Sequence, residues 1–366
     1  MIERDELAAW LRLLETPQLG RDSARKLLAA FGSPQAVLEA STSARQEVAG
    51  VAGAALASAP ESIEALVEST WQWLAAGESR AVVTLGDEAY PQTLLDTADP
   101  PLLLYVQGRI GLLGAPSVAV VGSRNPTRQG VDNARAFAAH LSRAGLSVVS
   151  GLALGIDGAA HEGGLEGPGS TIAVVGTGLD RVYPKRHLEL ARRIATQGLM
   201  LSEYALGTPP LPQHFPLRNR LIAGLSLGTL VVEAATQSGS LITARLALEA
   251  GRDVFAVPGS IHAPQSRGCH ALIKQGAKLV DGAQDILDEL RVTAPQAIAA
   301  APPRDDRGDR GDLLLDALGF DPVTIDALVA RTGMAPAELS ARLLELELDG
   351  RVARLAGQLF QRVGQA

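Results

Sequence analysis

Short β-branched runs alternate with helical segments between about residues 115 and 290, and this alternation constrains the fold of the 366-residue chain more than any other feature. The β-branched runs are Ser117–Val121, Ser147–Ser150, Thr171–Val175, Thr229–Val232 and Asp253–Val257. Short strands are also expected earlier, at Val82–Leu85 and Leu102–Tyr105. The helical segments are Val131–Arg143, Ile156–Glu166, Leu188–Thr196 and Leu241–Ala250. Strands that alternate with helices build a parallel sheet covered on both faces. The sequence therefore predicts an α/β fold, with an extended Rossmann-like parallel sheet over residues 79–292.

The region before this sheet has a different pattern. Residues 1–78 are predicted to form a helical N-terminal domain, because apolar residues such as Leu7, Leu11 and Leu14 recur at helical spacing. A helix, a glycine-containing turn and a second helix around Leu19–Gly32 resemble a helix-hairpin-helix or SAM-like unit. Such a turn can offer backbone N–H groups to phosphate. Simple helical packing is the alternative interpretation of the same pattern.

The region after the sheet divides into a linker and a small domain. Residues 293–312 are rich in Pro and Ala and then in charge, which is typical of a linker. Residues 313–366 read as three helices followed by a hairpin around Gly357, which predicts a winged-helix domain. Its recognition helix, Pro336–Leu348, carries three glutamates against the single Arg342. Because like charges oppose phosphate binding, we expect this domain to make protein contacts or regulate, and not to bind duplex.

The charge of the chain also restricts what it can bind. The formal net charge is −7, whereas a protein that coats duplex with its whole surface is usually basic. The segment from Leu179 to Arg220 has the opposite sign, with seven cations against three acids. These are Arg181, Lys185, Arg186, Arg192, Arg193, Arg218 and Arg220 against Asp180, Glu189 and Glu203. Any nucleic acid is therefore expected at one focused site.

Several classes of protein are disfavoured by the sequence. The single Cys269 excludes an intramolecular disulfide and fits a reducing compartment. The start of the chain lacks an export leader, and no apolar stretch approaches the ~20 residues of a membrane helix, so we expect a cytoplasmic protein with no membrane partner. The histidines are dispersed and no dinucleotide or Walker A fingerprint is present, so neither a metal nor a cofactor is predicted.

Glycine and hydroxyl residues gather where the predicted strands end. The turns of interest contain Gly122, Ser123 and Arg124, then Gly151, then Gly176, Thr177 and Gly178 with Lys185 beyond, then Ser238, Gly239 and Ser240, and finally Gly259. Glycine lets a ligand approach the backbone closely, and a helix that starts after such a turn points its N–H groups at the ligand. Because the carboxyl ends of parallel strands meet at one edge, these turns are expected to form one phosphate-binding rim.

Two arginines, an amide and an aromatic ring crowd into the six residues Phe215–Arg220. Arginine matches phosphate oxygens bidentately, and an aromatic face can stack on a base. The cluster therefore favours nucleic acid at the same rim, although Asn219 and one of Arg218 and Arg220 could brace the loop instead.

Asp157 and His161 are four residues apart and share a helix face. They could form a catalytic pair, or they could brace the preceding loop. No nucleophile or third ligand lies nearby in the sequence, so we favour the brace.

Taken in order, these motifs resemble the DNA-processing protein DprA (Smf) family. The runs that carry the resemblance are Val121–Arg124, Ser150–Asp157, Gly178–Asp180, Ser202–Tyr204, Phe215–Ser226, Ser238–Ser240 and Val257–Gly259. The resemblance covers roughly residues 80–290. It implies a bacterial protein of natural transformation that binds incoming single-stranded DNA, loads the recombinase RecA on it, forms a homodimer and has no enzymatic activity.

The resemblance also suggests a path for the strand. DNA would run over Arg124, Lys185, Phe215, Arg218 and Arg220, with Phe215 stacked on a base and the glycine turns holding phosphates. Two positions depart from the family pattern. His187 stands where the family usually has Asn, which we expect to leave a loop brace intact. Pro212 stands where some members carry Lys, which removes one phosphate contact.

The competing hypothesis is an enzyme. Rossmann-like enzymes that cleave nucleoside monophosphates resemble this domain but carry the run Pro-Gly-Gly-x-Gly-Thr-x-x-Glu at a strand end. The comparable turns here read Ser-Gly-Ser and Pro-Gly-Ser without that run. We therefore favour a binding protein over a nucleoside-monophosphate phosphoribohydrolase.

Overall fold

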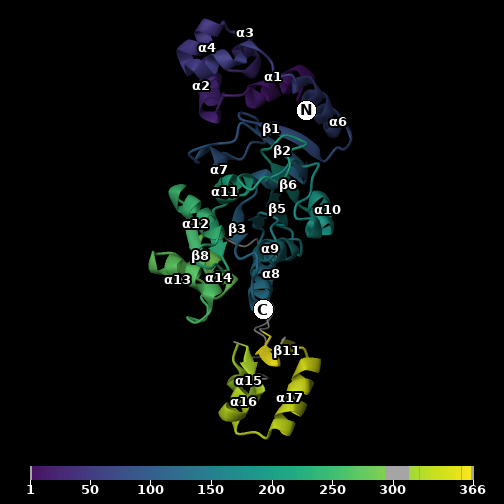
Figure 1. The fold of residues 1–366 in the computed structure, drawn as a ribbon, viewed down its shortest axis with the longest axis vertical. Helices are drawn as coiled ribbons and strands as arrows, with labels where there is room; N and C mark the ends of the chain where they lie inside the picture. Colours follow the sequence, from purple (N-terminus) through teal and green to yellow (C-terminus); the bar gives the residue numbers. More distant parts are fainter. Residues whose placement is uncertain (1, 293–312, 321, 356, 364–366) are drawn as a thin grey trace.

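The computed structural model describes residues 2–292, 313–320, 322–355 and 357–363. The predicted linker, 293–312, lies outside the described residues. Figure 1 shows the N-terminal helices at one end of the long axis, the sheet and its helices in the middle, and the C-terminal domain at the other end. Every helix among the described residues is too short or too polar to cross a bilayer.

Within the described residues, the central sheet has nine strands in the order β1-β2-β6-β5-β4-β3-β7-β8-β9. Neighbours from β6 to β9 pair in parallel, whereas β2 pairs antiparallel with both β1 and β6. The strands are β1 Arg80–Thr84, β2 Leu103–Gly108, β3 Ser117–Val121, β4 Ser147–Ser150, β5 Thr171–Val174, β6 Leu199–Ser202, β7 Gly228–Val231, β8 Asp253–Ala256 and β9 Lys278–Leu279. The chain order reverses between β3 and β7. Such a switch point places a ligand crevice beyond the carboxyl ends of these two strands.

Helices cover both faces of the sheet, as the alternating pattern predicts. They are α7 Gln92–Leu95, α8 Arg128–Arg143, α9 Ile156–Gly164, α10 Leu188–Gln197, α11 His214–Leu225, α12 Ser240–Glu249, α13 Arg267–Lys274 and α14 Ala283–Glu289. Side chains of β3 alternate between the two cores, because successive strand residues point to opposite faces. Val118 and Val120 pack in the core under α8 and α9, and Ala119 and Val121 in the core under α11 and α12.

The sequence patterns located most of these elements, and β3 and β4 have the predicted bounds. Strand β6 and helix α11 were not predicted. Helix α11 begins with a cluster that looks like a polar loop, and Pro216 lies near its start. Proline is tolerated in the first turn of a helix, because the N–H groups there have no intrahelical acceptor. Leu221, Ile222 and Leu225 then bury one side of α11 against the sheet.

The N-terminal region is helical, as predicted. Its helices are α1 Arg4–Glu15, α2 Arg21–Phe31, α3 Pro34–Glu39, α4 Thr42–Ala49, α5 Val51–Ala54 and α6 Ile63–Ala75. Ser33 and Ser41 cap α3 and α4, each accepting a backbone N–H at 3.2 Å. The core of this region includes Leu7 and Leu27 and continues into Tyr105 of β2, so the helices pack on the antiparallel edge of the sheet.

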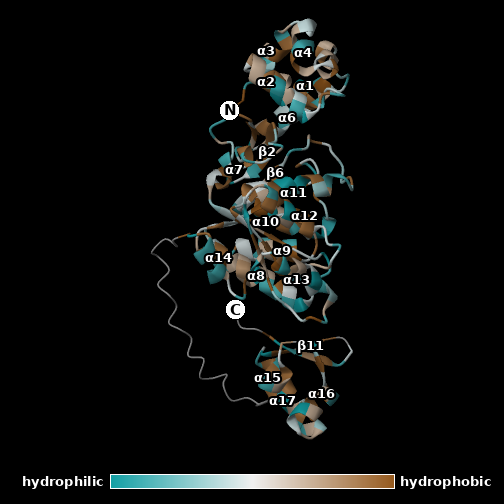
Figure 2. Cartoon of the chain, turned by 90° about the vertical axis from the view of Figure 1, so that its left-hand side faces the viewer, coloured by the Kyte–Doolittle hydropathy of each residue, from teal (hydrophilic) through white to brown (hydrophobic). Residues whose placement is uncertain are grey.

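The C-terminal region is a winged helix with a core of its own. It comprises α15 Leu313–Leu318, β10 Val323–Thr324, α16 Ile325–Thr332, α17 Pro336–Leu348, β11 Val352–Leu355 and β12 Leu359–Arg362. The three strands form a sheet in the order β10-β12-β11. Hydrophobic and hydrophilic residues share these helices, as on the helices that cover the large sheet (Figure 2). This distribution is expected of amphipathic helices that each bury one side.

Candidate nucleic-acid interface

A cavity of about 480 Å³ opens at the switch point between β3 and β7. It brings together the turn after β3, the first turn of α9, the start of α11 and the turn that leads into α12. Nine of the predicted site residues line it, namely Gly122, Ser123, Arg124, Phe215, Arg218, Asn219, Ser238, Gly239 and Ser240. Four others, Gly151, Lys185, Arg220 and Gly259, are not among its lining residues. Some of the turns that were predicted to form one rim thus lie together at this cavity, and others do not.

The turn after β3 is held in place by Glu233, which follows β7. The N–H of Ser123 donates to the Glu233 carbonyl at 2.7 Å, and the N–H and hydroxyl of Thr127 donate to its carboxylate at 2.9 and 2.5 Å. A Cβ on Gly122 would lie 2.9 Å from the same carbonyl, so only glycine fits there. Glu233 therefore fixes the loop that presents Arg124.

The carboxylate of Asp157 braces the turn after β4. It accepts the N–H of Gly151 at 3.2 Å and the N–H of Ala153 at 3.3 Å. Burial raises the pKa of Asp157, and this effect is opposed by the charge of Arg218 and by the two backbone hydrogen bonds. Because the N–H of Gly151 already has an acceptor within the protein, it is not free for a phosphate, in contrast to the expectation from the sequence.

His161 supports the same turn through a second set of hydrogen bonds. Its Nε2 accepts the N–H of Leu152 at 3.2 Å, so Nδ1 carries the proton and donates to the hydroxyl of Thr171 at 2.7 Å. Thr171 in turn donates to the carbonyl of Val148. Burial lowers the pKa of His161 to about 3, and the charge of His187 acts in the same direction. The neutral ring is thus fully engaged in a brace, which is the interpretation that the sequence favoured.

His187 also supports the turn. Its Nδ1 donates to the carbonyl of Leu152 at 3.0 Å. The departure from Asn at this position therefore keeps a hydrogen-bond donor to the loop.

Arg218 is buried against the strand ends. Its guanidinium donates to the carbonyls of Gly151 and Val174, and a Cβ on Gly151 would overlap it at 2.2 Å. Burial lowers the pKa of Arg218 to about 10, an effect that the Asp157 carboxylate opposes and the charge of Arg124 reinforces. Arg218 was predicted to contact DNA. The structure places it in the wall of the cavity, where its hydrogen bonds to backbone carbonyls connect α11 to the strand ends.

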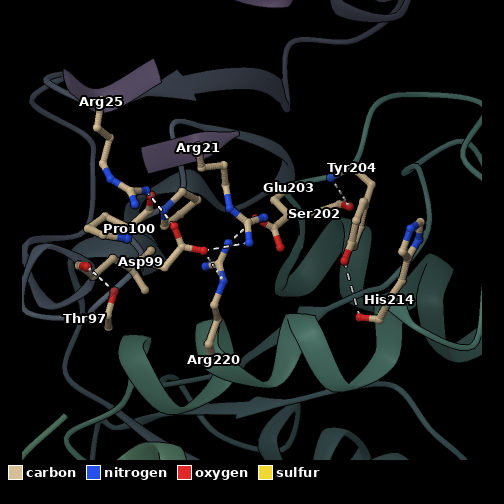
Figure 3. Close-up of polar contacts among 12 residues, drawn as sticks. Arg21, Arg25, Thr97, Asp99, Pro100, Ser202, Glu203, Tyr204, His214 and Arg220 are labelled. Atoms are coloured by element: carbon tan, nitrogen blue, oxygen red, sulfur yellow. Dashed lines mark hydrogen bonds and ion pairs between the residues drawn. The ribbon is translucent and has the colours of Figure 1, made fainter. Parts of the chain in front are cut away.

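Arg220 does not line the cavity. Its guanidinium contacts Glu203 and Asp99, and only 12% of its side chain is exposed (Figure 3). Asn219 donates to the carbonyl of Gly239 at 3.4 Å, which ties α11 to the turn before α12. Arg220 was expected to lie along the DNA path, and Asn219 was expected either to bind DNA or to brace the loop. The structure gives each of them a protein partner.

Arg124 and Lys185 are exposed, and neither has an ion-pair partner among the described residues. The half-buried ring of Phe215 is close to two guanidinium groups, with its centroid 6.0 Å from Arg124 and 5.9 Å from Arg218. The ring of Tyr183, which is 49% exposed, lies 5.4 Å from the Phe215 ring. An exposed cation can bind a phosphate, and an accessible aromatic ring can stack on a base. The sequence analysis did not identify Tyr183 as a stacking residue. Only 4% of the residues are aromatic, and this scarcity is a signal that an exposed aromatic residue has a function.

The turn before α12 supplies hydroxyl groups to the same cavity. The hydroxyls of Ser238 and Ser240 are 2.7 Å apart, and α12 begins at Ser240. The N-terminus of a helix favours an anion. Gly259 lies elsewhere, and its carbonyl accepts a hydrogen bond from His270 at 3.0 Å.

The fold and this site define a class: a Rossmann-like protein with a cavity at its switch point, followed by a winged helix. The chain belongs to the DNA recombination-mediator protein A family, whose model matches residues 81–291. A second model, the DprA winged helix domain, matches residues 297–358. The family predicted from the sequence is thereby confirmed.

Relatives in this family are similar over much of the chain. Protein Smf of Escherichia coli (strain K12) is 43% identical over 298 residues, which cover 80% of this chain and 79% of the relative. The DNA processing protein DprA of Streptococcus pneumoniae (strain R6) is 52% identical over 203 residues, which cover 56% of this chain and 72% of the relative.

Two solved structures share the fold. The X-ray structure of DprA from Streptococcus pneumoniae matches with a TM-score of 0.67 and 39% identity, covering 79% of this chain and 98% of that one. DNA processing protein A from Helicobacter pylori matches with a TM-score of 0.53 and 33% identity, covering 57% of this chain and 95% of that one. The latter work concerns the single-stranded DNA binding mode of the Helicobacter protein.

Proposed function

We propose that this protein binds single-stranded DNA in the cavity between β3 and β7 and across the adjoining surface of Tyr183 and Lys185. The observation that carries the proposal is the exposed Arg124, which has no ion-pair partner in the part of the chain that the structure describes and lies 6.0 Å from the Phe215 ring. Lys185 is a second exposed cation and follows Tyr183, whose ring contacts Phe215, by two residues. The proposed path keeps Arg124, Lys185 and Phe215 from the sequence prediction. It omits Arg218 and Arg220 as direct contacts, because protein groups occupy both.

The charge distribution favours a single strand over duplex. Only a small part of the rim is cationic, and the chain as a whole carries −7. A duplex presents two rows of phosphates to a broad surface, whereas a single strand can place its phosphates and bases in one narrow site.

The biological setting follows from the family. Members named DNA processing protein A and a DNA recombination-mediator family support a role in the processing of DNA for recombination. We infer that the protein loads the recombinase RecA on single-stranded DNA during natural transformation, acts as a homodimer and works in the cytoplasm. RecA filament formation on single strands, followed with and without the protein, tests the loading step. Sedimentation tests the dimer.

The binding step is tested with oligothymidylate in a salt titration. Arg124→Ala combined with Lys185→Ala should weaken binding and reduce the slope of log affinity against log salt by about 0.7 for each lost phosphate contact. The matched control is Arg192→Ala combined with Arg245→Ala, because those arginines are exposed and pair with Glu189 and Glu249. An unchanged slope in the first variant would remove both cations from the path.

The enzyme alternative has a direct assay. Incubation of the protein with nucleoside monophosphates should release no base. Release of base that depends on Asp157 would contradict the brace assigned to that residue and favour the hydrolase.

A further inference from the structure

Five charged residues form a cluster where the N-terminal helices meet the sheet, and we name it the Glu203 cluster (Figure 3). Arg21 and Arg25 come from α2, Arg220 comes from α11, and the carboxylates belong to Asp99 and Glu203. Glu203 directly follows β6. Three guanidinium groups from two parts of the chain therefore share two carboxylates.

The contacts make Arg21 and Arg220 partners of the same two acids. Arg21 bridges them, at 2.6 Å from Asp99 and 3.1 Å from Glu203. Arg220 contacts Glu203 and lies 3.4 Å from Asp99. Arg25 donates to Asp99 at 2.6 Å and to the carbonyl of Pro100 at 3.0 Å. A change at Arg21, in the N-terminal helices, consequently alters the charge balance around Arg220, which lies on α11 beside the sheet.

Burial makes this balance important. Only 5% of the Glu203 side chain and 12% of the Arg220 side chain are exposed. Burial alone would raise the pKa of Asp99, but the hydrogen bond from Arg25 and the charges of Arg220, Arg21 and Arg25 together lower it. Ion pairs that are this poorly hydrated are screened little by salt, and the loss of one partner leaves an uncompensated charge.

Helix α11 links the Glu203 cluster to the DNA site. The same helix carries Phe215, Arg218 and Arg220, so a shift of Arg220 moves the ring that is proposed to stack on a base. A second link exists beside it. The ring of Tyr204, next to Glu203, stacks on His214 with centroids 4.0 Å apart, and His214 immediately precedes Phe215.

We propose that the N-terminal helical domain sets the position of α11 through the Glu203 cluster, with Arg21 and Glu203 as positioning residues for single-stranded DNA binding. This inference rests on the proposed function. It assigns to the N-terminal helices an effect on affinity that does not require them to touch DNA.

Affinity is the first test. Arg21→Ala should weaken oligothymidylate binding by about three- to tenfold while leaving the salt slope unchanged, because Arg21 neutralises carboxylates and not phosphates. Arg21→Lys should give an intermediate loss, since one ammonium group cannot bridge both acids as the guanidinium does. The control is Lys26→Ala on the same helix, whose side chain is 60% exposed and pairs with Asp22.

Reciprocity supplies a second readout. If α2 and the DNA site are coupled, DNA must stabilise the docking of α2 by the same factor. Addition of oligothymidylate should therefore slow amide hydrogen exchange in α2 in the wild type and in Lys26→Ala, and not in Arg21→Ala or Glu203→Gln.

The outcomes separate the two proposals. Suppose that the wild type binds oligothymidylate. Equal affinity of the Arg21→Ala variant, or hydrogen exchange in α2 that does not change when DNA is added, would then overturn the coupling and leave the proposed function standing. A reduced salt slope in Arg21→Ala would make Arg21 a direct DNA contact and would also overturn it. Wild-type protein that fails to bind oligothymidylate would refute the proposed function itself.

Discussion

Arg124 and Arg218 lie on the same cavity but in opposite environments. Arg124 is exposed at the tip of a loop, whereas Arg218 is 4% exposed and donates to two buried carbonyls. A buried guanidinium that satisfies backbone carbonyls stabilises the fold, and an exposed one is available to a ligand. The residue type alone does not separate these roles.

Arg218→Ala should therefore act on stability. The change leaves the carbonyls of Gly151 and Val174 without their donor and the buried Asp157 without its neighbouring cation. We expect the free energy of unfolding to fall by roughly 3–5 kcal/mol. Chemical denaturation measures this, with Arg192→Ala as an exposed control. A variant that keeps its stability but loses DNA binding would indicate that Arg218 contacts DNA directly.

Phe215→Ala should act on binding. The ring is half-buried and lies next to Tyr183, so its removal takes away a stacking surface. We expect a loss of roughly 1–3 kcal/mol in the binding of single-stranded DNA. Phe215→Trp is the matched variant, because it keeps an aromatic face. Equal affinity of the alanine and tryptophan variants would mean that Phe215 is a packing residue.

At the scale of elements, α9 and the turn before it form one braced unit. Asp157 accepts backbone N–H groups from the turn, and His161 connects the turn to β5 through Thr171. The brace depends on a neutral imidazole, because Nε2 must accept a hydrogen bond.

This unit gives the fold a pH dependence. The folded-state pKa of His161 is about 3, below its ordinary value of 6.5, so between these values the unfolded state binds a proton that the folded state does not. The His161 contribution to stability is therefore present above pH 6.5 and is lost as the pH falls toward 3, by up to about 1.4 kcal/mol per pH unit. Denaturation curves of the wild type and His161→Gln across this range should differ in slope. Parallel curves would contradict the assignment.

Local patterns located the elements whose sequence carries its own signal. Ser117–Val121 reads as a buried strand because it is apolar and β-branched, and it is one. Helix α11 was missed because Pro216 lies in its first turn, three polar residues (Arg218, Asn219 and Arg220) follow that turn, and their partners are distant in sequence. Strand β6 was missed because Leu199–Ser202 contains no β-branched residue, only Leu and Met before Ser202.

At the scale of the whole molecule, the winged helix and the proposed DNA site differ in the sign of their exposed charges. Glu338 and Glu345 are exposed on α17, and Arg342 pairs with Glu345 at 2.7 Å. The face that recognition helices usually turn toward duplex is therefore acidic here.

The winged helix should not bind duplex. Residues 311–366 include a separate hydrophobic core, so the fragment can be tested alone. We expect its affinity for duplex to be weaker than about 10⁻⁴ M at physiological salt, because acidic side chains repel phosphates. Fluorescence anisotropy measures this, with the full chain on oligothymidylate as the positive control. Tight duplex binding by the fragment would reverse the prediction.

The sequence by itself determined the fold class, the family and some of the turns that line the cavity, because these depend on local periodicity and on short runs of glycine, hydroxyl and basic residues. Only the tertiary structure decided which basic residues are free. Arg218 finds its carbonyl partners 67 and 44 positions away, and Arg220 finds Glu203 17 positions away. Whether a guanidinium is buried or exposed depends on such distant contacts, which only the packed chain brings together.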